Sequence, residues 1–136
     1  MSAARLFLCF DSDRDDDLRK LFTRQFLPPG SGLRVVDWSK EENPHSGWEG
    51  ELRTRLGDVD VVVVLCSERT HDSVNVGREF GIAKEQEKPY VLLWGRRGSM
   101  CKKPHGARSD EGMYMWTPGS LEHRLAYGLR GSHEPA

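Results

Sequence analysis

The feature that most constrains the fold is the run from Val59 to Cys66, in which Asp60 is the one polar residue. Its β-branched side chains favour a strand. Because apolar residues follow one another instead of alternating with polar ones, both faces of that strand must be covered. Such strands are typical of the centre of a parallel sheet between two helical layers. The run therefore predicts an α/β fold, and it predicts the most buried strand of the chain.

Strand-like and helix-like segments alternate along the rest of the chain. Short apolar runs predict strands, and apolar residues at helical spacing predict helices between them. The predicted strands are 5–10, 33–37, 59–66, 89–94 and, at the edge, 113–116; helices are predicted around 18–26, after a capping box of Ser46 and Glu49, over 72–87 and around 121–129. This alternation predicts a flavodoxin-like open parallel sheet of strand order 2-1-3-4-5 with helices on both faces.

Length and composition narrow the functional classes. A chain of 136 residues suits one domain, which we expect to span 1–130, with 131–136 as a C-terminal tail. The 20 basic and 21 acidic residues nearly cancel, so no nucleic-acid partner is expected. No apolar run is long enough to cross a membrane or serve as a leader, so we expect a cytoplasmic protein without a membrane partner. The three cysteines form no CxxC pair and are expected to be reduced and buried.

A candidate site follows from the predicted strand order. In such sheets, ligands bind beyond the carboxyl ends of the strands where the order reverses, here between the first and third strands. The residues near these ends that we expect to bind substrate are Phe10, Asp11, Ser12, Asp37, Trp38 and His71. On the predicted 72–87 helix, Asp72, Asn75 and Glu79 are three and four residues apart and share a face, which adds Asn75 and Glu79 to the candidates.

Two interpretations of Glu79 are open at this point. It is either a carboxylate of the crevice or a solvated helix residue that pairs with Arg78 or Lys84, the usual fate of a glutamate. The 95–112 connection has a similar ambiguity, because its basic residues suit either phosphate binding or plain solvation. These residues are Arg96, Arg97, Lys102, Lys103 and Arg108.

Several known motifs are missing from the chain. It has no GxxxxGK[ST] loop, no GxGxxG after the first strand and no GxSxG elbow. A phospho-accepting receiver domain is excluded as well, because Leu65-Cys66-Ser67-Glu68 offers no aspartate at the end of the third strand. No metal site is suggested.

The order and spacing of several segments resemble the prokaryotic TIR-like family that includes the TIR-like component of Thoeris anti-phage defence. The resemblance extends from about residue 5 to residue 130. The segments that carry it are Phe10-Asp11, Asp37-Trp38, DVVVVLCSERTH at 60–71, GREFGIAKEQEKPY at 77–90, LLWG at 92–95, CKKPHGA at 101–107 and MYMWT at 113–117.

The resemblance implies an enzyme that consumes NAD as its substrate, without a further cofactor, and makes ADP-ribose or a cyclic ADP-ribose isomer as a signal. Enzymatic members use a glutamate in an SxxWCxxE motif, and Glu79 matches it. Asp72, Asn75 and Val76 stand where the motif has serine, tryptophan and cysteine. The family also implies a homo-oligomer that completes the site and a downstream effector that senses the product. Because TIR folds also serve as interaction modules, a non-catalytic adaptor is the alternative, with the 95–108 loop as a candidate assembly surface.

Overall fold

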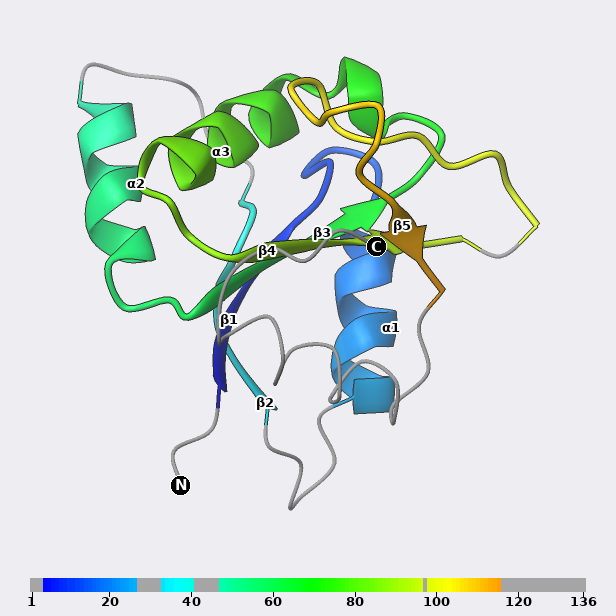
Figure 1. The fold of residues 1–136 in the computed structure, drawn as a ribbon. Helices are drawn as coiled ribbons and strands as arrows, with labels where there is room; N and C mark the ends of the chain where they lie inside the picture. Colours follow the sequence, from blue (N-terminus) through cyan, green and yellow to red (C-terminus); the bar gives the residue numbers. More distant parts are fainter. Residues whose placement is uncertain (1–3, 27–32, 41–46, 97, 116–136) are drawn as a thin grey trace.

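The computed structural model describes residues 4–26, 33–40, 47–96 and 98–115. Its centre is a sheet of five strands, all paired in parallel, in the order β2-β1-β3-β4-β5 (Figure 1). The predicted strand order is therefore confirmed. The strands are β1 (Ala4–Cys9), β2 (Leu33–Trp38), β3 (Val61–Cys66), β4 (Tyr90–Trp94) and β5 (Met113–Tyr114).

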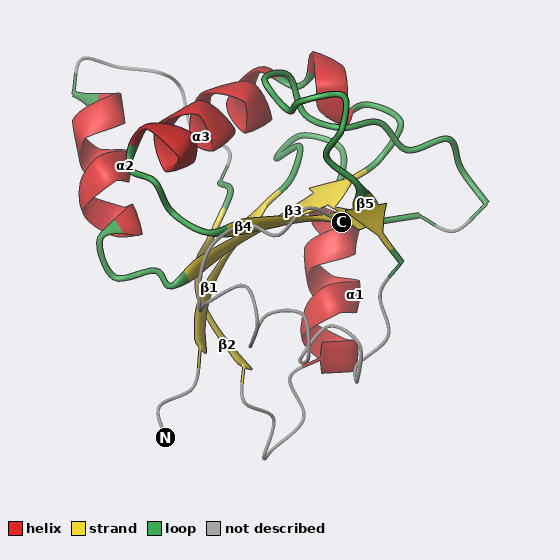
Figure 2. Cartoon of the chain, in the orientation of Figure 1, coloured by secondary structure: helices red, strands yellow, loops and turns green. Residues whose placement is uncertain are grey.

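Helices cover both faces of this sheet, as predicted. Helix α1 (Asp16–Phe26) lies on one face, and α2 (Trp48–Leu56) and α3 (Val74–Glu85) lie on the other (Figure 2). A single 3₁₀ turn, η1 (Thr70–Asp72), precedes α3. The chain thus has three layers among its described residues, with the sheet in the middle.

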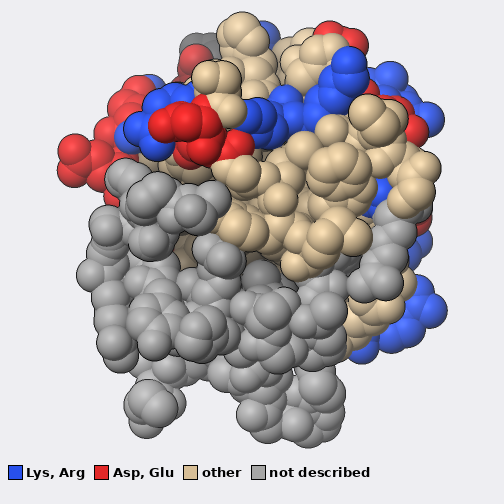
Figure 3. Space-filling model, turned by 45° about the vertical axis from the view of Figure 1, so that its right-hand side comes forward, with Lys and Arg blue, Asp and Glu red and all other residues tan. Residues whose placement is uncertain are grey.

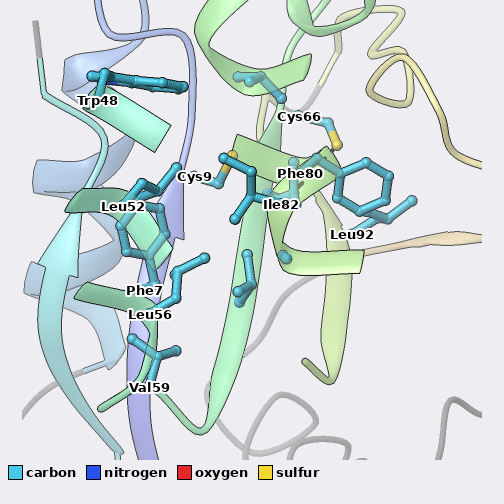
Figure 4. Packing of buried hydrophobic residues seen from close by; sticks show 14 of the residues in the cluster. Phe7, Cys9, Trp48, Leu52, Leu56, Val59, Cys66, Phe80, Ile82 and Leu92 are labelled. Carbon is cyan, nitrogen blue, oxygen red and sulfur yellow. Dashed lines mark hydrogen bonds between the residues drawn. The ribbon is translucent and has the colours of Figure 1, made fainter. Parts of the chain in front are cut away.

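Strand β3 is buried along its whole length and pairs in parallel with β1 and β4. Val61, Val63 and Leu65 pack in the cluster on the α1 face. The intervening residues Val62, Val64 and Cys66 pack in the cluster on the α2 and α3 face, which Figure 4 shows from close by. Each such side chain contributes roughly 1.5–3 kcal/mol to folding. The prediction from the apolar run is confirmed.

Helix α3 begins two residues later than expected. Ser73 is its N-cap: the backbone there is extended, and the side chain accepts a hydrogen bond from the Val76 amide. The same residue, Ser73, ends the preceding 3₁₀ turn and caps the start of the helix. Asp72 consequently belongs to the turn and not to the helix face on which we expected it.

Some of the other predicted helix and strand boundaries lie within the described residues and some do not. The N-cap of α2 is Gly47, in the left-handed region at φ 90°. The predicted capping box placed the N-cap one residue earlier, at Ser46, and is wrong by that one position. The helix near 121–129 and the tail 131–136 lie outside the described residues, so these remain predictions. The edge strand β5 is shorter than predicted.

The described part of the 95–112 connection is held by one lysine of its own and one of α3. Lys103 Nζ donates to three backbone carbonyls, those of Arg108, Ser109 and Glu111, at 2.9 Å each. Lys84 Nζ of α3 donates to Gly106 O at 2.6 Å. Because of its three bonds, Lys103 is a structural residue of the loop. On the face shown in Figure 3, basic side chains lie interspersed with acidic ones.

Candidate active site

Glu79 lies on α3 beside the carboxyl ends of β1 and β2, and it is only 6% exposed. Ser39 Oγ donates a hydrogen bond to Glu79 Oε1 at 2.5 Å. Asn75 Nδ2, one helical turn earlier, donates to Oε2 at 3.3 Å. The carboxyl group is thus held at both oxygens by groups from two different elements.

The solvated interpretation of Glu79 is wrong, since its proposed partners are engaged elsewhere. The Arg78 guanidinium lies over the Trp48 ring at 5.6 Å, and Lys84 binds the 95–112 loop. Burial on the α3 face turned toward the sheet, next to Val76 and Phe80, explains why neither cation reaches the carboxylate.

Ser39 is the residue that sequence reasoning missed. It follows β2 directly and is 2% exposed. Its amide donates to Leu8 O at 2.9 Å, which extends the pairing of β2 with β1 by one residue. The expected site stopped at Trp38; continuing the strand-end rule by one position would have found the hydroxyl.

Asn75 connects the β1–α1 loop to α3. Its Nδ2 donates to Phe10 O at 2.9 Å, and its Oδ1 accepts from the Ser12 amide at 3.1 Å and from Ser73 Oγ at 3.1 Å. Ser12 Oγ also lies 3.3 Å from the same oxygen. Of the expected substrate-binding residues, Ser12 and Asn75 are therefore brought together with Glu79.

The environment raises the pKa of Glu79 from 4.5 to about 7. Burial is the main cause, because it disfavours the charged form. Hydrogen bonds from Ser39, Asn75 and Cys9 and the charge of Arg55 act in the opposite direction. A carboxyl group that changes charge near neutral pH is typical of functional sites.

Phe10 and Asp11 contribute backbone and turn structure. The Phe10 side chain is fully buried in the cluster on the α1 face, so only its backbone reaches Asn75. Asp11 Oδ1 accepts from the amides of Asp13 and Arg14 at 3.0 Å each, and Oδ2 binds the Arg14 guanidinium at 2.9 Å. Burial raises the pKa of Asp11, but the bonds from Arg14 and Ser73 outweigh it and leave that pKa lowered.

The side chains of Asp37 and Trp38 make their contacts with residues other than Glu79. Asp37 binds Arg55 of α2 through two bonds, at 2.6 and 3.0 Å. The Trp38 ring packs against the cluster on the α1 face, and the Arg19 guanidinium lies 4.8 Å from its centroid. The sheet therefore separates the Trp38 ring from α3.

His71 and Asp72 sit together in η1 with exposed side chains, and His71 Nε2 lies 3.3 Å from Asp72 Oδ1. Asp72 does not share the face of Asn75 and Glu79, since it precedes the helix. Neither residue belongs to the buried network around Glu79.

A second buried carboxylate, Asp15, lies in the β1–α1 loop. Its side chain is fully buried, and it accepts from Ser67 Oγ at 2.6 Å and from Arg96 Nη2 at 3.0 Å. Arg69 Nη1 lies at 3.5 Å. Asp15 thus joins the loops that follow β1, β3 and β4.

No group of three or more histidine, cysteine, aspartate or glutamate side chains among the described residues is placed to hold a metal ion. None of the helices that the structure describes is long and apolar enough to span a membrane. All three cysteines are buried and free, as expected.

The parallel sheet of order 2-1-3-4-5 is the flavodoxin-like arrangement expected of a TIR-like domain, and Glu79 is buried on the helix that follows β3. A sequence model of the family described as Thoeris protein ThsB, TIR-like domain, matches residues 7–97, two-thirds of the chain. The chain belongs to this family, and the resemblance is confirmed. It is a defence-related TIR-like domain of the Thoeris type. No curated protein matches the chain in sequence.

Proposed function

We propose that the protein cleaves NAD between nicotinamide and ribose, with Glu79 as the catalytic carboxylate. Its product, ADP-ribose or a cyclic ADP-ribose isomer, would act as a signal in anti-phage defence. The observation that supports this proposal is the buried Glu79 carboxyl group, held at both oxygens and poised to change charge near neutral pH.

A single carboxylate is enough to catalyse the cleavage of the bond between nicotinamide and ribose. Nicotinamide bound to ribose is a cationic pyridinium and leaves as a neutral molecule, so its departure needs no general acid. The ribose then develops the positive charge of an oxocarbenium ion, which an adjacent carboxylate stabilises and orients. Water captures the sugar to give ADP-ribose, or an adenine nitrogen captures it to give a cyclic isomer. NAD is the substrate in both routes.

The two Glu79 oxygens are not equally available to a ribose hydroxyl. Ser39 holds Oε1 at 2.5 Å, whereas the Asn75 contact with Oε2 is longer, at 3.3 Å. Asn75 Nδ2 also has a closer partner in Phe10 O at 2.9 Å. A ribose hydroxyl would therefore bind Oε2 in place of the Asn75 contact while Ser39 keeps Oε1 fixed.

The proposal also assigns partners. Asn75 contacts Glu79 directly and Ser12 is linked to it through Asn75, so both would contact the substrate. The exposed His71 would also contact the substrate, and a neighbouring copy of the chain would complete the site. A downstream effector would bind the nucleotide product.

A second candidate function is that of a non-catalytic adaptor. It is favoured by the residues that flank Glu79, because Asn75 and the buried Val76 stand where enzymatic relatives have tryptophan and cysteine. In that case Glu79 and its partners would serve the fold, and the surface around the 95–108 loop would bind the partner.

The deciding experiment is incubation of the concentrated protein with NAD, with nicotinamide release followed by chromatography. Glu79→Gln should lower turnover at least about a hundredfold, a loss of about 3 kcal/mol in transition-state stabilisation. Glu85→Gln is a matched control, since Glu85 lies on the same helix, is exposed and pairs with Arg53. Equal rates for the wild type and Glu79→Gln would refute the catalytic role. Absence of turnover by the wild type at concentrations that favour oligomers would favour the adaptor.

A further inference from the structure

The Ser39 hydroxyl lies at the centre of three polar contacts. Its oxygen is 2.5 Å from Glu79 Oε1 and accepts from the Phe10 amide at 3.0 Å. The third neighbour is Leu8 O, at 3.4 Å. A serine hydroxyl carries one proton to donate and two lone pairs to accept with. The position of that single proton therefore depends on the charge of Glu79.

Both charge states can be satisfied without moving a heavy atom. When Glu79 is ionised, the hydroxyl donates to Oε1 in a charge-assisted bond. When Glu79 carries a proton, the carboxyl group donates to Ser39 Oγ. The hydroxyl then donates to Leu8 O, which accepts one hydrogen bond from the Ser39 amide and has a second lone pair for this one. The Phe10 amide keeps its acceptor in both states.

We propose that Ser39 is a positioning residue that holds the Glu79 carboxyl group in one place in both charge states and favours the charged one. The charged state is favoured because a hydrogen bond to a carboxylate is stronger than one between neutral groups. The inference deepens the proposed function and rests on it for its effect on turnover. The hydrogen-bond network itself is independent of any activity.

The other groups that face Glu79 keep their charge near neutral pH. Burial and the neighbouring Glu79 raise the pKa of the Cys9 thiol, which therefore stays protonated. Arg55 of α2 remains charged and is paired with Asp37. The pKa of Asp37 is raised by burial but lowered on balance by Arg55, so Asp37 stays ionised. None of these three groups therefore changes its charge near pH 7.

The test is the titration of the Glu79 carboxyl carbon by NMR in protein labelled with ¹³C-glutamate. The signal that disappears in Glu79→Gln identifies it. The wild-type midpoint should lie near pH 7, and Ser39→Ala should move it up by about one unit. The ascending limb of kcat against pH for nicotinamide release should move by the same amount, which loss of stability alone would not produce.

Two further variants complete the design. Ser67→Ala removes a buried hydroxyl that binds another buried carboxylate, Asp15 at 2.6 Å, and so it should lower stability without moving the Glu79 midpoint. Ser39→Cys keeps a side chain of similar size but replaces a strong donor with a weak one, so its midpoint should lie between those of the wild type and Ser39→Ala.

An unchanged Glu79 midpoint in folded Ser39→Ala would overturn the inference; if that variant does not fold, an unchanged midpoint in Ser39→Cys would do the same. A shifted midpoint in a protein that releases no nicotinamide would support the positioning role while refuting the proposed function. The two failures are thus distinguishable.

Discussion

Replacing Glu79 with glutamine should stabilise the protein, and the gain should depend on pH. The folded state raises the pKa of this carboxyl group from 4.5 to about 7. Between those two values the folded state binds the proton more tightly than the unfolded chain, so stability falls as pH rises. Above about pH 8 the full cost of burying the charge is present. A neutral glutamine side chain avoids that cost.

The magnitude follows from the size of the shift. One pKa unit corresponds to about 1.36 kcal/mol, so a rise of this size makes the ionised form about 3 kcal/mol less stable in the folded protein. For a domain of this length that is roughly 10 °C in Tm. The glutamine amide can donate to Ser39 Oγ while its oxygen accepts from Asn75 Nδ2, which mimics the protonated carboxyl group.

The assay is urea unfolding of the wild type and Glu79→Gln between pH 5 and 9. The free energy of unfolding of the variant should exceed that of the wild type by about 1 kcal/mol at pH 5 and by about 3 kcal/mol at pH 9. All other titrating groups cancel in this difference. Glu85→Gln, the control on the same helix, should show no gain at high pH, since the pKa of Glu85 is lowered by Arg53. A constant difference across the range would refute the reasoning.

The remaining predictions concern stability. Asp15→Asn should lower the free energy of unfolding by about 2 kcal/mol, because it removes the charge of a fully buried carboxylate that accepts from Ser67 and Arg96. Arg96→Glu should cost a similar amount, whereas Lys102→Glu, at an exposed position of the same loop, should stay within about 0.5 kcal/mol. Gly95→Ala should cost about 2 kcal/mol, because a Cβ there would lie 2.5 Å from Cys66 O. Urea unfolding at pH 7 measures all four, and wild-type stability in Asp15→Asn or Gly95→Ala would contradict the described packing.

The fold could be predicted from local sequence signals. The run from Val59 to Cys66 predicted a central parallel strand, and β3 is that strand. Alternating strand and helix patterns predicted the 2-1-3-4-5 order with helices on both faces. These features follow from hydrophobic patterning, which is local along the chain. The start of α3 was misplaced because the Ser73 cap and the 3₁₀ turn before it compete with the helix over only a few residues.

The site was predicted in part. Strand-end reasoning and the TIR-like resemblance singled out Glu79 and placed Asn75 and Ser12 near it, and the structure brings these three together. The same reasoning grouped the Trp38 and His71 side chains with them, but the structure places Trp38 against the α1 face and His71 in an exposed turn. The strand register decides toward which face of the sheet a side chain at the strand end points, and a shift of one residue moves that side chain to the opposite face.

The sequence by itself determined the order of the elements and the residue types available at the carboxyl edge of the sheet, since both depend on neighbours in the chain. Only the tertiary structure decided which of these residues act together. Ser39 and Glu79 are forty residues apart, and they meet because β2 pairs with β1 while α3 packs across the same face. That contact and the burial around it set the charge of Glu79, and neither is encoded in any local pattern.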